Sequence, residues 1–351
     1  MILHRRNILF GIASLPASTL LARRQLVGLT ATVYNGYELH TALQAAGPGS
    51  SILLAPGTYG DLGSLLRVTQ PEVTIRAEPG AIIYHTSLRI EAPGVLVDGL
   101  AFVGSPDIPD DAEPDTHPWL YMAAVIENRA FTSAVRVDAA DTEIRNCDFS
   151  RYSNKAIDVR ASALRTYIHD NLFHDCQSGA GAAVMVGASM SDTNKNVGAR
   201  LINNRCINLA AGSSETLSFK SSGNLMQGNT LNNCNNLTNR HGNGNRFISN
   251  VVERSQGIVI QDSNTLLQGN RVSNIRVGPG IQIMQGSMPY GGTTQGKHPQ
   301  AAFTVLSNNN GPLMIGRGYS GYTYPALNTK VQSHTGSISL VPGGHTGTTG
   351  A

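Results

Sequence analysis

Two basic residues, Lys220 and Arg240, occupy matching positions of an apparent repeat, in a chain where only 14% of residues are charged. Lys220 lies nine residues before Asn229, and Arg240 lies ten before Asn250. If one turn is a residue longer, the two cations stand on adjacent coils about 5 Å apart. Like charges stacked on one face of a sheet repel, so the pair is unfavourable unless a bound polyanion or a catalytic role compensates for the repulsion. Chance placement on an exposed face is the alternative.

The cations lie within a series of segments that align on one polar position. The six segments are EIRNCDFSRY, YIHDNLFHDC, RLINNRCINL, NLMQGNTLNN, RFISNVVERS and TLLQGNRVSN. The aligned residues are Cys147, Asn171, Asn204, Asn229, Asn250 and Asn270, at spacings of 24, 33, 25, 21 and 20 residues. An apolar residue follows each of them two positions later. Alternation within a segment and recurrence once per coil are typical of a stacked parallel β-solenoid, in which the repeated Asn side chains form a ladder.

We therefore predict an all-β fold, a single-stranded right-handed parallel β-helix (solenoid) over residues 31–340. The low charge and the 38 glycines also favour short strands joined by turns. The segment Tyr37 to Ala46 has a helical pattern, and a capping helix there would cover the open first coil. Residues 341–351 are rich in Gly and Thr and are expected to form a flexible tail.

An acidic, Pro-rich stretch interrupts the repeat at residues 104–130 and contains the only Trp. We interpret it as an insertion loop. It is either a lid or wall over a cleft or a solvated insertion, and the second is favoured because surface loops readily accept such segments.

Residues 1–30 are typical of an export signal and its processing region. A charged pair precedes a short apolar stretch from Ile8 to Ala22, which Pro16 interrupts. Arg5 and Arg6 resemble the twin-arginine form of such signals, so folded export and ordinary secretion are equal alternatives, with a frayed N-terminal helix as the third. A periplasmic or secreted location is expected, with no membrane span in the mature chain.

Charge is unevenly distributed along the chain. Removal of the N-terminal segment, which carries four arginines and no acids, changes the net charge from +3 to −1. No global basic charge favours a nucleic-acid partner. Residues 192–276, however, hold nine cations against four acids, and this region could attract a polyanion.

The four cysteines do not form a disulfide framework. Cys147, Cys176, Cys206 and Cys234 fall one per segment, but at offsets of 0, +5, +2 and +5 from the aligned position. The two that share an offset are two coils apart, roughly 9 to 10 Å. A disulfide needs Cα atoms within about 7 Å. We interpret them as buried thiols and propose no metal site on them.

The sequence around the two cations resembles polysaccharide lyase family 6, the group of alginate lyases and chondroitinase B. The matching residues are Glu215, five residues before the Lys220-Ser221 pair, and the triplet Arg240-His241-Gly242. The resemblance runs from about residue 31 to 286 and includes ALQAAGPGSSILLAPGTY near the start. Together these motifs are specific, whereas a lone Lys-Ser or Arg-His-Gly is not.

The resemblance implies β-elimination on a uronate-containing polysaccharide, with alginate the favoured substrate. Lys220 takes the proton at C5, and Arg240 assists departure of the 4-linked oxygen as acid. A Lys must be neutral to act as base, and a neighbouring Arg lowers its pKa from about 10.4. His241 either holds the substrate or is a turn residue bonded to backbone.

The sequence departs from the family pattern at the metal position. In many members a second acid stands two residues before the Glu and helps hold calcium; here that position is Ser213. Glu215 is then the candidate metal ligand, besides its role as a candidate substrate contact. Calcium is a weak candidate cofactor, because one hard ligand makes a poor calcium site.

The substrate-binding arginines expected in the strands AAVMVG and GIVIQD are replaced by Met185 and Val259. Arg205 and Arg271 are the alternative cations for binding the substrate. Either protein cations neutralise the uronate carboxylate without metal, or the substrate differs from that of better-studied members.

Two other functions remain open beside the favoured reading of a secreted or periplasmic lyase acting on an anionic polysaccharide. A uronan C5-epimerase abstracts the same proton on the same scaffold. A non-catalytic solenoid that binds glycans is supported by the missing acid and arginines.

Overall fold

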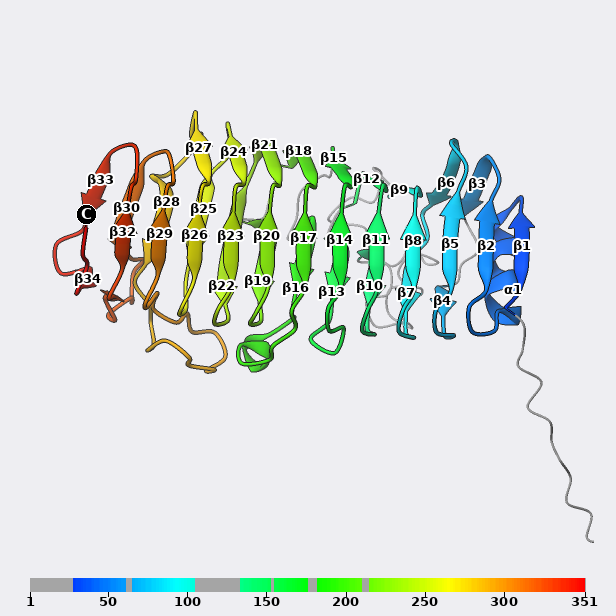
Figure 1. The fold of residues 1–351 in the computed structure, drawn as a ribbon, viewed down its shortest axis with the longest axis horizontal. Coiled ribbons are helices and arrows are strands. Elements are labelled where there is room, and N and C mark those ends of the chain that lie inside the picture. The colour runs from blue at the N-terminus through cyan, green and yellow to red at the C-terminus, as the bar shows by residue number, and fades with distance from the viewer. Residues whose placement is uncertain are drawn as a thin grey trace, which may run out of the picture.

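The computed structural model describes residues 28–60, 65–104, 133–152, 155–175, 182–209 and 215–350. Short strands dominate these residues and stack as coils along one long axis (Figure 1). Three long sheets run along the stack, and we call them sheets A, B and C; sheet B ends at β27, whereas sheets A and C continue to β32 and β33.

The bounds of the strands follow, sheet by sheet and in stacking order. Sheet A contains β1 (Thr30–Val33), β2 (Ser51–Leu54), β5 (Thr74–Ala77), β8 (Leu96–Asp98), β11 (Glu143–Arg145), β14 (Tyr167–His169), β17 (Arg200–Ile202), β20 (Leu225–Gln227), β23 (Arg246–Ile248), β26 (Leu266–Gln268), β29 (Val305–Ser307) and β32 (Lys330–Gln332). Sheet B contains β3 (Gly57–Gly60), β6 (Ala81–Tyr84), β9 (Ala101–Val103), β12 (Asp148–Ser150), β15 (Leu172–His174), β18 (Arg205–Leu209), β21 (Thr230–Cys234), β24 (Val251–Glu253) and β27 (Arg271–Ser273). Sheet C contains β4 (Leu66–Val68), β7 (Leu88–Ile90), β10 (Ser133–Val137), β13 (Lys155–Val159), β16 (Val184–Val186), β19 (Glu215–Lys220), β22 (Asn236–His241), β25 (Gly257–Ile260), β28 (Gly280–Met284), β30 (Leu313–Arg317) and β33 (Ile338–Leu340).

The chain visits the three sheets in the same order in successive coils. One coil consists of β14, β15 and β16, and the next of β17, β18 and β19, with neighbouring strands parallel in each sheet. A one-turn 3₁₀ helix (Met190–Asp192) lies between β16 and β17. The predicted all-β fold, a parallel β-helix, is confirmed.

The core is a set of columns in which one side chain per coil stacks on the next. Phe102, Phe149 and Phe173 share a register position on sheet B and stack at 4.9 Å between ring centroids. The column continues through Cys206, Leu231, Val252 and Val272. From Phe149 onward, these are the apolar residues that the sequence repeat places two positions after its aligned column, so the predicted phase is confirmed.

The predicted Asn ladder lies at the turn between sheets A and B. Asn204 Nδ2 donates to Asn229 Oδ1 at 3.0 Å, and Asn229 Nδ2 donates to Asn250 Oδ1 at 3.0 Å. Equivalent bonds join Asn171 to Asn204 and Asn250 to Asn270, and a further one extends the ladder to Asn309. The preceding residue has left-handed backbone, which Asn, Asp and Gly adopt most readily; it is Asn203 in one coil (φ 54°) and Gly228 in the next (φ 66°).

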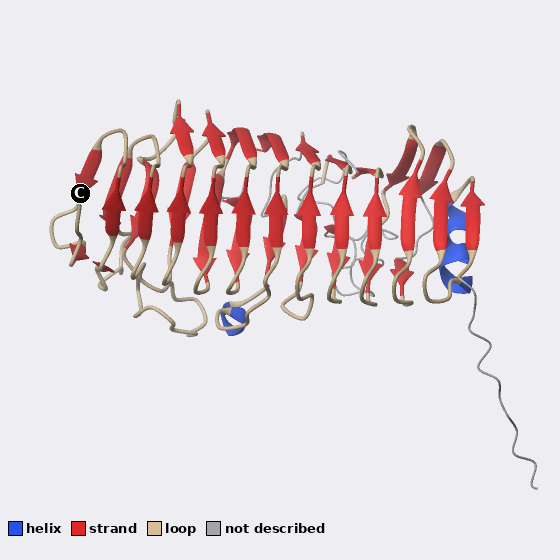
Figure 2. Cartoon of the chain, viewed as in Figure 1, coloured by secondary structure: helices blue, strands red, loops and turns tan. Residues whose placement is uncertain are grey.

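Helix α1 (Gly36–Ala45) covers the first coil, one residue ahead of the predicted span (Figure 2). The Asn35 side chain accepts a hydrogen bond from Glu38 N at 2.9 Å, and Glu38 Oε2 accepts one from Tyr34 N at 2.8 Å. This reciprocal cap fixes where the helix begins. Leu39 and Leu43 are buried in the core cluster, so the predicted capping helix is confirmed.

The chain beyond residue 341 continues the stack where a flexible tail was expected. Strand β34 (His345–Thr346) pairs in parallel with β31 (Ala326–Leu327), and Thr349 bridges to Lys330. Pairing with the preceding coil gives these backbone groups the hydrogen bonds that an unpaired tail would lack. The insertion predicted at residues 104–130 and the export signal predicted at residues 1–30 fall almost entirely on residues 105–132 and 1–27, which lie outside the described residues.

Three of the four cysteines are described, and each is a buried thiol outside any disulfide, as expected: Cys147, Cys206 and Cys234. Burial raises the pKa of the Cys147 thiol to about 12, so it is unreactive at ordinary pH. Cys176 lies outside the described residues. In the part of the chain that the structure describes, no helix is long and apolar enough to cross a membrane.

Candidate active site

Lys220 and Arg240 stand on adjacent strands of sheet C, β19 and β22, as the repeat predicts. Phe219 pairs with Asn239, but Lys220 pairs with His241, so Arg240 is an extra residue at a register shift. The one-residue difference in spacing therefore comes from a β-bulge within the strand, not from a longer turn. Such a bulge re-aims a side chain and is often found beside a functional site.

Hydrogen bonds to Ser221 and the backbone conformation of Gly242 fix the turns that follow the two cations. The Ser221 carbonyl accepts from Asn224 Nδ2 at 2.8 Å and from Asn245 Nδ2 at 2.9 Å. Gly242 has φ +111°, and a Cβ there would overlap the Ser221 carbonyl oxygen. The Gly of the Arg-His-Gly triplet is thus required by a left-handed backbone and a close approach.

Asp262 connects this turn to a loop from another part of the chain. Its carboxylate accepts from Gly242 N at 2.8 Å and from Gly291 N at 2.9 Å. The Asp262 side chain is buried, and burial raises its pKa despite these two bonds. Because Gly291 belongs to the loop between β28 and β29, Asp262 holds that loop against the end of β22.

Arg240 forms an ion pair with Glu215, the acid of the sequence motif. Arg240 Nη1 donates to Glu215 Oε1 at 2.7 Å. The Glu215 side chain is only 6% exposed and that of Arg240 is 33% exposed. Charge-assisted bonds of this length are strong and directional, so Glu215 orients the guanidinium.

The environment of Lys220 favours its neutral form. Burial is the main cause that lowers the pKa of its ammonium, and the nearby cations Arg240 and Lys155 lower it further. The carboxylates of Glu215 and Asp158 oppose this shift without cancelling it. A lysine with a lowered pKa provides a larger neutral fraction, which is what a general base requires.

His241 is buried beside both cations and is neutral at ordinary pH. Burial and the charge of Arg240 lower its pKa to about 3. Its ring stacks on that of His298, with 6.1 Å between centroids. The Nδ1 atom of His241 has no hydrogen-bond partner within the described parts of the chain. A neutral imidazole can bind a hydroxyl group, but this nitrogen is enclosed by the protein, so the role of His241 in holding the substrate stays a prediction.

A hollow of about 200 Å³ opens beside Arg240. Its lining residues are Glu215, Asn236, Thr238, Arg240, Val259, Gln261, His298, Tyr319 and Tyr322. The ring of His298 lies 5.8 Å from that of Tyr322, whose hydroxyl accepts a 3.4 Å bond from Gln261 Nε2. His298, Tyr319 and Tyr322 were not found by sequence reasoning. Their signal would have been the aromatic-rich GYSGYTY and the His-Pro pair in loops that interrupt the repeat.

The floor of the site is the outward side of sheet C. Met185, Ser218, Thr238 and Val259 share one register position on successive strands. Each is buried, although the neighbours that flank it along its strand point into the core. Met185 and Val259 thus occupy the row where arginines were expected, and the floor is apolar at those two coils.

Solved structures of known enzymes share this architecture. A mannuronic acid specific polysaccharide family 6 lyase from human gut microbiota aligns with a TM-score of 0.67 and 16% identity, over 90% of this chain and 85% of that one. The chain has the fold of polysaccharide lyase family 6. A PL6 alginate lyase in complex with a trisaccharide aligns with a TM-score of 0.58 and 15% identity, over 89% and 85% of the two chains.

A third neighbour is the PL6 family polysaccharide lyase from Pseudopedobacter saltans, with a TM-score of 0.57, 15% identity and 89% and 93% coverage. No protein-family model and no curated protein matches the sequence. The shared fold therefore supports the resemblance to polysaccharide lyase family 6 noted in the sequence. At such low sequence identities, the fold is the only property that the comparison shows to be shared.

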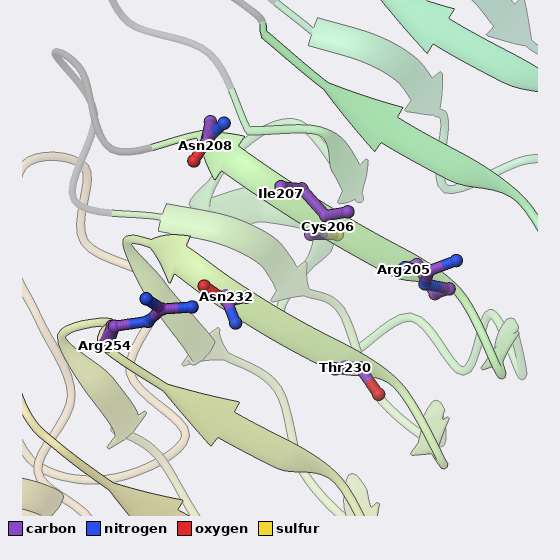
Figure 3. Close-up of a pocket in the computed structure, with 7 residues that line it drawn as sticks. All are labelled: Arg205, Cys206, Ile207, Asn208, Thr230, Asn232 and Arg254. Atoms are coloured by element: carbon purple, nitrogen blue, oxygen red, sulfur yellow. The ribbon is translucent and has the colours of Figure 1, made fainter.

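Arg205 and Arg271, the alternative substrate-binding cations, lie elsewhere on this family 6 fold. Both are exposed on sheet B, on β18 and β27, whereas Lys220 and Arg240 lie on sheet C. Arg205 borders a hollow on sheet B (Figure 3). The structure does not bring these two arginines to the candidate active site. Arg205 immediately follows a ladder Asn, a phase different from that of Lys220, and this was the signal available in the sequence.

The described residues do not fit a calcium ion at Glu215. The Glu215 carboxylate is bonded to the Arg240 guanidinium, and no group of three or more His, Cys, Asp or Glu side chains suited to a metal occurs among the described residues. A calcium site needs several oxygen ligands, and a cation already paired with one of them opposes binding. Ser213, the position of the missing second acid, lies outside the described residues.

Proposed function

We propose that this chain is a secreted or periplasmic polysaccharide lyase that cleaves a uronate-containing polysaccharide by β-elimination, with mannuronate-containing alginate the favoured substrate. The observation that carries the proposal is that Arg240 lies beside Lys220, whose pKa is lowered. The bulge in β22 and the bond to Glu215 hold Arg240 in this position. The fold of family 6 lyases and the hollow beside Arg240 support it.

The chemistry needs one base and one group that stabilises developing negative charge. Neutral Lys220 takes the proton from C5 of the uronate, a double bond forms between C4 and C5, and the bond from C4 to the linking oxygen breaks. Arg240 donates to the departing oxygen as the acid. Negative charge that develops on the substrate meets the Arg240 guanidinium, already in place, and the ammonium that forms on Lys220, and both stabilise the transition state more than the ground state.

We further propose that the substrate carboxylate is neutralised without calcium, by Arg240 and by the ammonium that Lys220 becomes once it has taken the proton. The ion pair between Glu215 and Arg240 supports this, because it already uses the carboxylate that a metal would need. Glu215 then acts as a positioning residue for Arg240. Activity that is abolished by a chelator and restored by calcium would contradict this proposal.

The test is formation of unsaturated uronate, measured by ultraviolet absorbance, on polymannuronate, polyguluronate and dermatan sulfate, each with calcium and with chelator. We expect activity on polymannuronate that survives the chelator. Lys220→Ala and Arg240→Ala should each lower kcat by more than about 100-fold, the usual contribution of a positioned acid or base. Lys330→Ala is the matched control, because Lys330 is exposed on sheet A.

Other outcomes separate the alternatives. Full activity in both variants would show that the roles are wrongly assigned. Proton NMR that shows altered uronate composition without new chain ends would favour a C5-epimerase. Binding without turnover, with or without metal, would favour a non-catalytic glycan-binding solenoid.

A further inference from the structure

Arginines in the two halves of the molecule differ in their partners. Most described arginines before residue 200 pair with a carboxylate; the pairs are Arg67–Glu91, Arg76–Asp98, Arg89–Asp138, Arg136–Asp138, Arg145–Asp98, Arg160–Asp158 and Arg165–Asp141. By contrast, six later arginines have no carboxylate within ion-pair distance in the described residues: Arg200, Arg205, Arg246, Arg254, Arg271 and Arg276. Uncompensated cations on a folded surface favour an external anion.

Two of these arginines, Arg205 and Arg254, stand at opposite ends of a hollow on sheet B (Figure 3). The hollow has a volume of about 270 Å³, and its remaining lining residues are Cys206, Ile207, Asn208, Thr230 and Asn232. No carboxylate lines it. The neighbouring acids are engaged: Asp175 pairs with His174 at 2.8 Å, and Glu253 accepts from Asn274 at 3.3 Å.

A third arginine extends this surface along the stack. Arg205, Thr230, Val251 and Arg271 share one register position on four successive strands of sheet B. The strand spacing therefore separates Arg205 from Arg271 by about 14 Å along the long axis. Arg254 lies in the turn after β24, one of the two strands between them. Arg205 and Arg271 are therefore aligned along the axis of the solenoid, and Arg254 lies across the sheet from them, at the other end of the strands.

The chemistry of this surface fits an acidic polysaccharide. Guanidinium groups bind carboxylates, and the Thr230 and Asn232 side chains provide donors and acceptors for hydroxyl groups. Single-stranded nucleic acids bind to aromatic side chains on which their bases stack, and no aromatic residue lines this hollow. The surface therefore matches a polymer that carries carboxylates and hydroxyls along its length.

We infer that Arg205, Arg254 and Arg271 form a second, non-catalytic binding surface for a polyuronate chain, on sheet B and apart from the candidate active site on sheet C. This inference rests on the proposed lyase function for the identity of the polymer. A second contact point raises the effective concentration of the polymer near the candidate active site, which increases the overall affinity for long chains.

The experiment measures the affinity of polymannuronate for the full chain carrying Lys220→Ala, in which turnover is blocked. In this background, Arg205→Ala with Arg254→Ala is expected to weaken binding at least fivefold, and addition of Arg271→Ala to weaken it further. The matched control is Arg246→Ala with Lys330→Ala, which removes the same charge from exposed positions on sheet A, and its affinity should stay within twofold. Far-ultraviolet circular dichroism verifies that each variant is folded. Arg254→Glu, which reverses the charge at this position, is the second variant that tests the sheet B surface.

The outcomes are separable. Equal binding by the sheet B variant and the control, while the unmutated chain still cleaves the polymer, would refute the second surface and leave the proposed function intact. If the unmutated chain neither binds nor cleaves any polyuronate, the proposed function fails as well. A single-stranded oligonucleotide that binds through the same arginines more tightly than polymannuronate would overturn the choice of polymer.

Discussion

A single inserted residue determines which residue of β22 stands opposite Lys220. Without the register shift, residue 240 would pair directly with Lys220, as in a regular strand ladder. The bulge leaves Lys220 opposite His241, and it leaves Arg240 with a 2.7 Å bond to Glu215. Lys220, Arg240 and His241, with Glu215 as the counter-ion of Arg240, therefore lie on two adjacent strands.

At the residue scale, the state of His241 has a consequence for stability. Its pKa is lowered to about 3 in the folded chain, mainly by burial, whereas an unfolded His titrates near 6.5. Below pH 6.5 the unfolded state therefore binds the extra proton, and stability falls as pH falls from about 6.5 toward 3. Between pH 7 and pH 5 this single group should cost about 2 kcal/mol.

Urea unfolding of the unmutated chain and of His241→Asn at pH 7 and pH 5 measures this cost. We expect the unmutated chain to lose about 2 kcal/mol more than the variant over that interval. Equal losses would mean that His241 is not held neutral by its surroundings. His298→Asn is the comparison, because burial also lowers the pKa of His298.

At the element scale, the Asn ladder joins successive coils at one turn. Asn229 donates to Leu201 O at 2.9 Å and to Asn250 Oδ1 at 3.0 Å, and its own Oδ1 accepts from Asn204 N and Nδ2, each at 3.0 Å. The side chain is fully buried. Its removal would leave donors and acceptors of two neighbouring coils without partners, which is more costly than the loss of an exposed hydrogen bond.

Asn229→Ala should therefore destabilise the chain by at least about 3 kcal/mol. Asn232→Ala is the control: it lies on the same strand, points outward into the sheet B hollow and should cost less than about 1 kcal/mol. Thermal and urea unfolding of both variants give the comparison. A cost for Asn229→Ala no larger than that of the control would show that the ladder contributes little to stability.

At the scale of the whole molecule, each coil contacts mainly its two neighbours, so a local defect should stay local. Helix α1 covers the first coil with the buried Leu39, while Tyr37 on the same helix is 74% exposed. Leu39→Ala opens a cavity at the end of the core, and such a change costs about 2 to 5 kcal/mol.

Hydrogen exchange read by mass spectrometry should show this locality. In Leu39→Ala we expect faster exchange in β1, β2 and β5, and unchanged exchange in β19 and β22 under native conditions. Tyr37→Ala should leave both regions as they are. Accelerated exchange in β19 and β22 would mean that the solenoid opens as one cooperative unit.

The sequence alone determined the architecture, because every coil of a solenoid requires the same types of residue at the same positions. Asn204, Asn229 and Asn250 recur at the same phase, and so do the apolar residues two positions later, which made the ladder and the core column visible. The order of Lys220 and Arg240 along this repeat was enough to place them on adjacent strands. The cap at Leu39 was also predicted, from a helical pattern ahead of the first coil.

Only the tertiary structure decided which side chains meet at the site. The bulge at Arg240 has no signature in its own residue type, so its bond to Glu215 appeared only when the strands were paired. His298 and Tyr322 come from loops of irregular length, whose position depends on anchors such as Asp262. Arg205 was assigned to the site by its charge, but its phase in the coil places it on sheet B. A repeat specifies what every coil shares, whereas a site is built from the places where the coils differ.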